Sequence, residues 1–115
     1  MKLYGIPNCS TVKMARVWLE EHGIAYEFFD FKKMGVPESM LTVLMQNRGW
    51  ELLINRNGPT WRKLPEERKA QVNDATGALA VMREHSSVIK RPILEHDGKH
   101  LIGFKEAEYA EFFGQ

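Results

Sequence analysis

Apolar and polar positions in the first third of the chain change their period twice. Residues 2–6 place apolar side chains before Pro7-Asn8, which predicts a short strand. Residues 10–22 repeat apolar side chains with the period of a helix, and Gly23 ends it. The predicted buried face of this helix consists of Val12, Ala15, Trp18 and Leu19. The aromatic-rich run 24–31 predicts a second strand, so the first third has the length of a βαβ unit.

The middle of the chain is predicted to be helical. A helix begins near Pro37 and ends near Gly49, and its inward side chains are Met40, Leu41, Leu44 and Met45. Residues 55–64 are rich in turn-forming residues and exclude a continuous helix. A short helix begins at Pro65, with acidic residues in its first turn. A further helix is predicted over 74–85, with Ala75, Leu79 and Met82 inward.

The last third is predicted to form a hairpin and a helix. Residues 91–96 and 100–104 form the two strands, and Asp97-Gly98 between them is a tight-turn signal. Residues 105–113 form the final helix, with Phe104, Ala107 and Phe113 available to pack. The order βαβ, helices, ββα predicts an α/β protein with a four-stranded mixed sheet. We interpret this as a single thioredoxin-like domain over 1–115, formed by about 1–34 and 88–115, with a helical insertion at about 35–87.

Composition and charge narrow the function classes. The chain has 115 residues, 43% hydrophobic and 27% charged, as is ordinary for one globular domain. A formal net charge of +1 argues against a broad surface for nucleic acid or anionic lipid. No run approaches the roughly 20 apolar residues that span a bilayer, and the N-terminus does not resemble a secretory signal. We therefore expect a cytoplasmic protein, bound neither to nucleic acid nor to a membrane, and monomeric.

Cys9 is the only cysteine of the chain, and its position suggests chemistry. If the first strand ends at Ile6 and the helix begins near Ser10, the sulfur lies at a helix N-terminus. Unpaired backbone N–H groups and the positive end of the helix dipole stabilise a thiolate there, and the same N–H groups can hold an oxyanion. A buried, inert cysteine is the alternative. The polar neighbours Asn8, Ser10 and Thr11 favour an exposed, reactive thiol.

A second thiol must come from outside the chain. The thioredoxin redox motif is C-x-x-C, and here Val12 occupies the fourth position of "CSTV". A mixed disulfide at Cys9 could therefore be resolved only by glutathione or by a partner protein such as a glutaredoxin-type thiol donor.

Basic and aromatic residues elsewhere are candidates for substrate binding. In a thioredoxin-like domain, Arg91-Pro92 would lie beside the thiol, with a cis bond as one possibility; Arg91 could then pair with an anion. Arg56 in the turn-rich region could bind a carboxylate, and Trp61 could stack on a substrate or cover the core. Lys13, one helical turn from Cys9, could support the thiolate. For Arg91 and Lys13, a solvated surface charge is the alternative.

Other kinds of site find little support in the sequence. His96 and His100 flank the tight turn without a cysteine or an acidic cluster, so no metal site is expected. A glycine-rich phosphate loop and a G-x-S-x-G motif are also absent. No bound cofactor is expected, and glutathione would act as a co-substrate.

Four stretches in order carry a family resemblance. "LYGIPNCSTVKMARVWLEEHGIAYEFFDF", "NRNGPTWRKL", "IKRPIL" and "LIGFKEAEY" resemble the arsenate reductase (ArsC) and Spx-type family. Within that family they are most similar to the small bacterial branch of YffB-like thiol reductases. The resemblance covers nearly the whole chain and implies a thioredoxin-like fold with a helical insertion.

The resemblance assigns roles to particular residues. It implies that Cys9 is the catalytic nucleophile, that Arg91 precedes a cis Pro92, and that the loop arginine matches Arg56, although some relatives place it at the position of Asn57. The third arginine of arsenate reductases falls on Gly103, so the three-arginine arsenate pocket is incomplete. Spx-type regulators bind RNA polymerase and often carry C-x-x-C, which this chain lacks.

The sequence thus predicts a glutathione-dependent thiol reductase with Cys9 as nucleophile. The expected binding residues for glutathione or substrate are Asn8, Ser10, Thr11, Arg56, Arg91 and Pro92, with support from Lys13 and Trp61. Two alternatives stay open. One is an Spx-like regulator or protein-binding module in which Cys9 is a sensor or a relic. The other is a genuine arsenate reductase.

Overall fold

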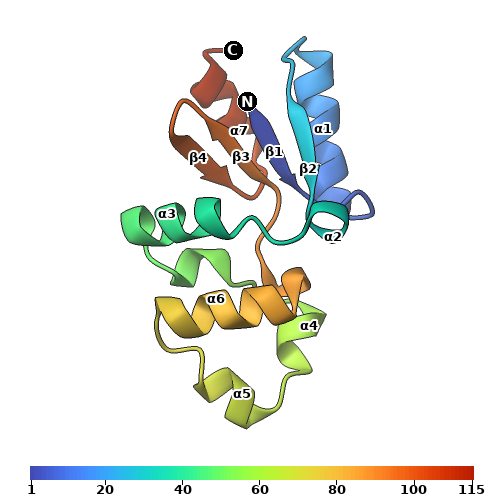
Figure 1. The fold of residues 1–115 in the computed structure, drawn as a ribbon. Helices are drawn as coiled ribbons and strands as arrows, with labels where there is room; N and C mark the ends of the chain where they lie inside the picture. The colour runs from blue at the N-terminus through green and yellow to red at the C-terminus, as the bar shows by residue number, and fades with distance from the viewer. The chain divides into compact units, whose positions relative to one another are not determined.

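A computed structural model describes residues 1–115, and the chain divides into two compact units. Unit 1 comprises residues 1–34 and 91–115, and unit 2 comprises residues 35–90. Figure 1 shows the elements of both units. The elements of unit 1 are β1 (Lys2–Gly5), α1 (Ser10–Glu21), β2 (Glu27–Asp30), α2 (Phe31–Met34), β3 (Ile93–His96), β4 (Lys99–Ile102) and α7 (Glu106–Phe113). No helix of the chain has the length and apolar character that crossing a membrane requires.

The four strands of unit 1 form one mixed sheet in the order β2-β1-β3-β4. β1 runs parallel to β2, whereas the pairs β1–β3 and β3–β4 are antiparallel. The β3–β4 connection is the two-residue turn Asp97-Gly98, in which both residues have positive φ (51° and 74°), as type I′ turns require. This topology confirms the predicted thioredoxin-like α/β fold.

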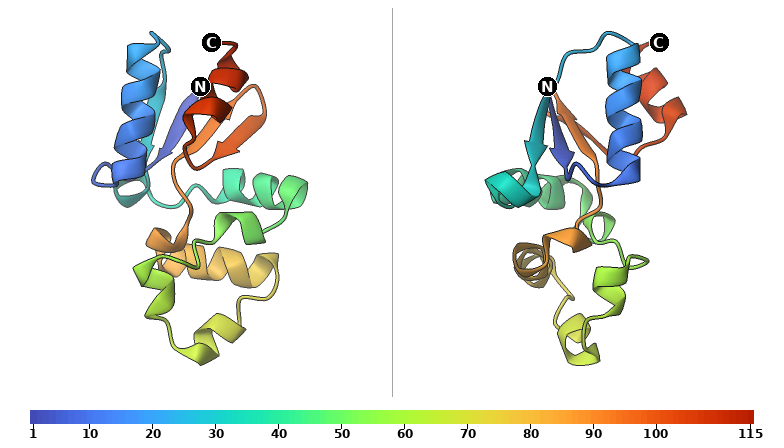
Figure 2. Two further views of the ribbon diagram at one scale, coloured as in Figure 1. Left: turned by 180° about the vertical axis from the view of Figure 1, so that it is seen from behind. Right: turned by 90° about the vertical axis from the view of Figure 1, so that its right-hand side faces the viewer.

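Helices α1 and α7 pack on the same face of the sheet (Figure 2). Side chains alternate between the two faces of a strand, so Leu3 and Leu94 point towards these helices. The buried cluster on this face is Leu3, Ala15, Trp18, Leu19, Leu94 and Tyr109. The predicted inward face of α1 is confirmed, because Val12, Ala15, Trp18 and Leu19 are all buried.

Several predictions for unit 1 need correction. The strands predicted over 91–96 and 100–104 are Ile93–His96 and Lys99–Ile102. The strand predicted over 24–31 is limited to Glu27–Asp30, because the Asp30 carboxylate accepts the Lys32 amide at 2.8 Å and so begins α2. In the final helix Ala107 is exposed and Tyr109 is the fully buried side chain. The Lys105 carbonyl accepts the backbone N–H of Tyr109, one helical turn later. At this position the Tyr109 side chain points to the face of α7 that packs on the sheet.

Unit 2 is helical. Its elements are α3 (Glu38–Arg48), the 3₁₀ turn η1 (Glu51–Leu53), α4 (Pro59–Arg62), α5 (Glu66–Ala70), α6 (Ala75–Glu84) and the 3₁₀ turn η2 (Ser86–Val88). The longest two, α3 and α6, are joined on the surface by the Arg83–Glu38 ion pair at 2.7 Å. An isolated β-bridge joins Ile54, which follows η1, to Ile89, near the end of the unit.

The predicted helices of unit 2 are present, with two differences. The four inward residues predicted for α3 are buried, as expected. In α6 the buried residues are Ala78, Val81 and Met82, so the predicted face was wrong at Ala75, which is exposed. The reason is the cap: Asp74 accepts the Gly77 amide at 2.8 Å, which leaves Ala75 in the solvated first turn. The turn-rich stretch 55–64 also contains α4, which starts at Pro59, a favoured first position of a helix.

Candidate functional site

Cys9 is the N-cap residue of α1 and a half-exposed free thiol. Its backbone is extended (φ −101°, ψ 126°), and its carbonyl accepts the Lys13 amide at 3.0 Å, the first hydrogen bond of the helix. The first-turn amides that follow have no acceptor within the helix. No acidic residue lies in this turn. The thiol therefore stands where the helix dipole and free N–H groups favour an anion, with no carboxylate on the first turn to oppose it.

The short loop before Cys9 is held by close packing between β1 and α1. A Cβ atom on Gly5 would lie 2.8 Å from a methyl group of Val12, so the end of β1 approaches α1 more closely than any larger residue allows. Of the predicted polar neighbours in this region, Asn8 and Ser10 are exposed and Thr11 is half-buried. The strand-to-helix turn thus presents a polar surface around the sulfur.

The start of β3 lies at the same end of the sheet. In the antiparallel register Tyr4 is opposite Ile93, so the chain before Ile93 runs beside the chain after Tyr4, which leads to Cys9. The Arg91–Pro92 peptide bond is cis, as predicted. Pro92 is buried and Arg91 is half-buried. Unit 1 therefore brings Arg91 and Pro92 to the end of the sheet where Cys9 lies.

Gly103 belongs to this end of the sheet as well. Its amide donates to the Pro92 carbonyl at 2.8 Å, and its φ of +81° lies in the region that favours glycine. The position at which the resemblance would place a third arginine is therefore next to Pro92, and here it contributes no side chain.

Arg56 and Trp61 belong to unit 2, where they contact each other. The Arg56 guanidinium lies 5.5 Å from the Trp50 ring centre and 5.9 Å from that of Trp61, within cation–π range of both. Trp61 is half-buried, so it is not part of a buried core. The adjoining turn is closed by the Asn57 amide, which donates to the Asn55 side chain at 3.2 Å. Trp50 was not among the predicted site residues, and it is the second ring that the Arg56 guanidinium contacts.

A hydrogen-bonded network that was not predicted crosses three strands on the sheet face opposite α1. The Tyr4 hydroxyl donates to one Glu95 oxygen at 3.1 Å, and His100 Nε2 lies 2.9 Å from the other. Burial raises the pKa of Tyr4 to about 12, with a further contribution from the neighbouring Glu95 charge. The network depends on the strand register, which pairs Glu95 with His100.

The raised pKa predicts a specific loss of stability at high pH. The folded state holds the Tyr4 proton up to about pH 12, whereas the unfolded chain releases it near pH 10. The stabilisation is therefore complete below pH 10 and is lost as the pH rises through 12. We expect Tyr4→Phe to lose stability less steeply than wild type over this interval, as measured by urea unfolding at a series of pH values. Parallel curves for the two proteins would contradict the assignment.

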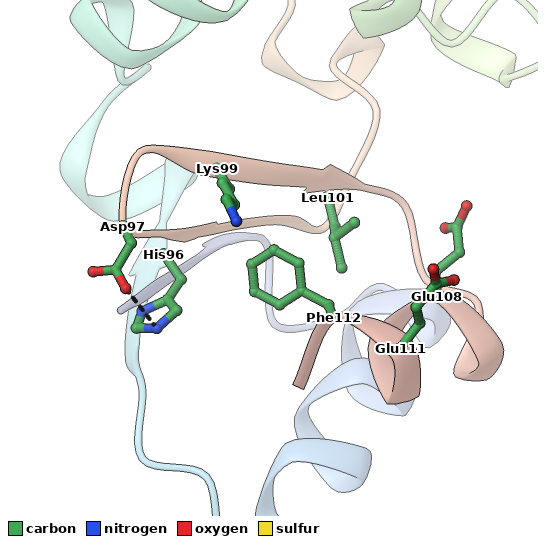
Figure 3. A pocket seen from close by; sticks show the side chains of 7 residues that line it. All are labelled: His96, Asp97, Lys99, Leu101, Glu108, Glu111 and Phe112. Carbon is green, nitrogen blue, oxygen red and sulfur yellow. Dashed lines mark ion pairs between the residues drawn. The ribbon is translucent and has the colours of Figure 1, made fainter. Parts of the chain in front are cut away.

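A pocket of about 650 Å³ lies between the β3–β4 hairpin and α7, and Figure 3 shows its lining. Phe112 lies in the middle of the view, with Leu101 on one side and the His96–Asp97 ion pair (3.3 Å) on the other. His96 lines this pocket while His100 pairs with Glu95, so the two histidines serve separate contacts. No cluster of three metal-ligating side chains exists in the chain.

Comparison with known proteins agrees with this architecture. A model of the ArsC family matches residues 4–112. The solved structure of a YFFB protein is 44% identical, with a TM-score of 0.90 and 96% of each chain covered. An arsenate reductase (ArsC) related protein from Brucella melitensis is 47% identical, with a TM-score of 0.76 and 99% and 94% of the two chains covered. The global transcriptional regulator Spx of Bacillus subtilis is 26% identical, over 96% of this chain and 84% of Spx. The chain belongs to the ArsC family.

Proposed function

We propose that this protein is a glutathione-dependent thiol reductase that works with one cysteine of its own. The observation that carries the proposal is the position of Cys9, a half-exposed free thiol at the N-cap of α1 beside the start of β3. Membership of a family that includes arsenate reductase-related proteins supports an oxidoreductase. Because Cys9 is the only cysteine, each catalytic cycle requires an external thiol.

The proposed cycle has two exchange steps. In the first, the Cys9 thiolate attacks the glutathione sulfur of a mixed disulfide between a substrate and glutathione. A Cys9–glutathione disulfide forms, the substrate–glutathione bond breaks, and the substrate leaves as a thiolate that takes up a proton. In the second, the thiolate of another glutathione attacks the glutathione sulfur held on Cys9, which releases glutathione disulfide and restores the Cys9 thiolate. The mixed disulfide and one reduced glutathione thus become the free substrate thiol and glutathione disulfide, so one glutathione is consumed in each cycle.

Residues near the thiol have distinct parts in this proposal. The first-turn amides of α1 stabilise the Cys9 thiolate, both before attack and when it leaves in the second step. Arg91 binds a carboxylate of glutathione, since a guanidinium matches a carboxylate with two parallel hydrogen bonds. Asn8, Ser10 and Thr11 supply polar groups to the peptide backbone of glutathione, and Pro92 forms the wall next to the sulfur. Lys13 adds a positive charge one turn further along α1. Arg56 and Trp61, which belong to unit 2, remain candidate residues for binding glutathione or substrate.

Arsenate is a less favoured substrate for this site. An arsenate pocket formed by three arginines would need a guanidinium at Gly103, which donates its amide to Pro92 and has no side chain. Arg91 is then the candidate arginine of unit 1 at the Cys9 end of the sheet, and a single guanidinium matches a single carboxylate. We therefore place disulfides of glutathione ahead of arsenate.

A regulatory role is the second candidate, and it is favoured by the similarity to Spx. The single cysteine counts against a switch based on an internal disulfide, because Val12 occupies the position of a second thiol. In this alternative, the protein would bind RNA polymerase without turning over a disulfide.

One assay separates these candidates. The reduced protein is given a small mixed disulfide of glutathione, or arsenate, with glutathione as the only reductant, and formation of glutathione disulfide is followed by its enzymatic reduction with NADPH. We expect turnover of the mixed disulfide and little or none of arsenate. Turnover of arsenate alone would support the arsenate reductase, and no turnover of either, together with capture of purified RNA polymerase, would support the regulator.

A further inference from the structure

Helix α1 carries apolar side chains on its solvent-exposed side as well as on its buried face. Met14 is 57% exposed and Val17 is 51% exposed, and both stand apart from the buried stripe of the helix. They line a groove of about 510 Å³ between α1 and the start of α7, two helices that lie side by side in Figure 2. The apolar lining of this α1–α7 groove consists of Met14, Val17, Trp18 and Phe104. An apolar groove of this kind on a soluble domain marks a binding surface.

The groove begins close to the reactive thiol. Lys13 lines it and donates its amide to the Cys9 carbonyl, so the groove opens one helical turn from the sulfur-bearing residue. Val17 is eight residues beyond Cys9, which corresponds to roughly 12 Å along the helix axis. An extended peptide covers that distance with about four residues. A substrate peptide bound in the groove therefore brings its own cysteine to Cys9 when its apolar side chains lie two to four residues from that cysteine.

Charges at the two ends of the groove give it a polarity. Lys13 lies at the Cys9 end, Glu21 lies about two helical turns further along α1, and Glu106 lines the groove from the start of α7. The acidic end attracts a basic side chain, and the apolar floor between the ends excludes charged ones. The groove therefore complements a segment that is apolar near its cysteine and basic about five or six residues away.

We propose that the α1–α7 groove binds an extended apolar segment beside the glutathionylated cysteine of a protein substrate, with a basic side chain of that segment at Glu21. This inference rests on the proposed function and names its substrate class, a protein mixed disulfide rather than a small disulfide. The exchange step is the one given above: the Cys9–glutathione bond forms, and the protein cysteine leaves as a thiol while its flanking chain occupies the groove.

The test compares mixed disulfides of glutathione with two short peptides. One peptide has leucines on both sides of its cysteine and a lysine at each end, and the other has serines in place of the leucines. We expect kcat/KM to be about tenfold higher for the leucine peptide, equivalent to about 1.4 kcal/mol of differential binding. Replacing the two lysines with glutamates should remove much of this advantage.

Matched double variants assign the preference to the groove. Met14→Gln with Val17→Asn changes the groove, and Met34→Gln with Val43→Asn makes the same replacements at residues outside it that are 59% and 48% exposed. We expect the groove variant to lose the preference for the leucine peptide, the control variant to keep it, and both to exchange with glutathione disulfide at the wild-type rate. Equal rates for the two peptides in wild type, or an unchanged preference in the groove variant, would overturn the proposal.

A binding measurement separates this proposal from the proposed function. The leucine peptide with serine in place of its cysteine cannot react, but it should shift the NMR signals of the Met14 and Val17 methyl groups, with saturation below about 1 mM. Saturable shifts without turnover of any disulfide would support peptide binding in the groove and would contradict the proposed reductase function. Turnover of glutathione disulfides without such shifts would support the reductase and contradict the groove.

Discussion

Cys9→Ser is expected to abolish the glutathione-dependent reduction of mixed disulfides, with a loss of about a thousandfold or more. A serine hydroxyl is not ionised at neutral pH and cannot form a disulfide, so neither exchange step has a substitute in this chain. The measurement is the rate of glutathione disulfide formation with a small mixed disulfide as substrate. The variant should fold like wild type, since Cys9 caps α1 through its backbone and its side chain makes no capping hydrogen bond.

Val43→Asn is the matched control for this loss. Val43 is exposed on α3 and takes no part in the proposed site, so its replacement should leave the rate unchanged. Residual activity of Cys9→Ser near the wild-type rate would show that the reaction does not pass through this thiol. If both variants lose activity, the cause is a damaged folded state and not the removal of the nucleophile.

Tyr109→Ala is expected to lower the free energy of unfolding by about 3–5 kcal/mol, the largest loss of stability that we predict. Tyr109 is fully buried, and its ring contacts the edges or faces of three other rings, with centroid distances of 5.5 Å to Trp18, 4.8 Å to Phe104 and 6.3 Å to Phe113. Its removal would leave a cavity between α1, α7 and the sheet. Urea unfolding followed by tryptophan fluorescence measures the change.

Tyr109→Phe is the control that separates packing from hydrogen bonding. The Tyr109 hydroxyl is buried without a hydrogen-bond partner, and burial raises the pKa of this tyrosine. Removing an unsatisfied buried hydroxyl should leave stability unchanged or raise it by about 1 kcal/mol. A loss of stability in Tyr109→Phe as large as that in Tyr109→Ala would contradict this account of the cluster.

Local sequence patterns were sufficient to predict the elements that position the Cys9 thiol. The helical period after Ser10 and the Pro-Asn pair before it predict both α1 and the place of Cys9 at its start, because each signal lies within a few residues. The Asp97-Gly98 turn and the strands beside it are likewise encoded locally. The cis bond before Pro92 was an expectation from the fold and the family resemblance, and the structure contains it.

Features that depend on pairing between distant segments were not predictable from local patterns. The contact of Tyr4 with Glu95 requires the register between β1 and β3, which joins positions 91 residues apart. Tyr109 is buried because α7 packs beside α1 on the same face of the sheet, whereas the helical pattern alone favoured Ala107. The side-chain caps at Asp30 and Asp74 shifted the ends of β2 and the buried face of α6, since a single carboxylate there competes with the apolar pattern.

The groove beside α1 was also missed, although part of its signal lies in the sequence. Met14 and Val17 are apolar residues that do not belong to the helical stripe Val12, Ala15 and Leu19, and together they form an exposed apolar pair on α1. The contribution of Phe104 depends on how α7 packs against α1, which the sequence pattern does not state.

Intact-protein mass spectrometry tests the central claim most directly. The reduced protein is incubated with glutathione disulfide, measured, digested to locate the modification, and then treated with reduced glutathione. The account predicts a mass increase of one glutathionyl group on the peptide that contains Cys9, and its complete removal by reduced glutathione. A Cys9 thiol that acquires no glutathione, or that keeps it in the presence of excess reduced glutathione, would contradict the proposal that an external thiol completes the cycle.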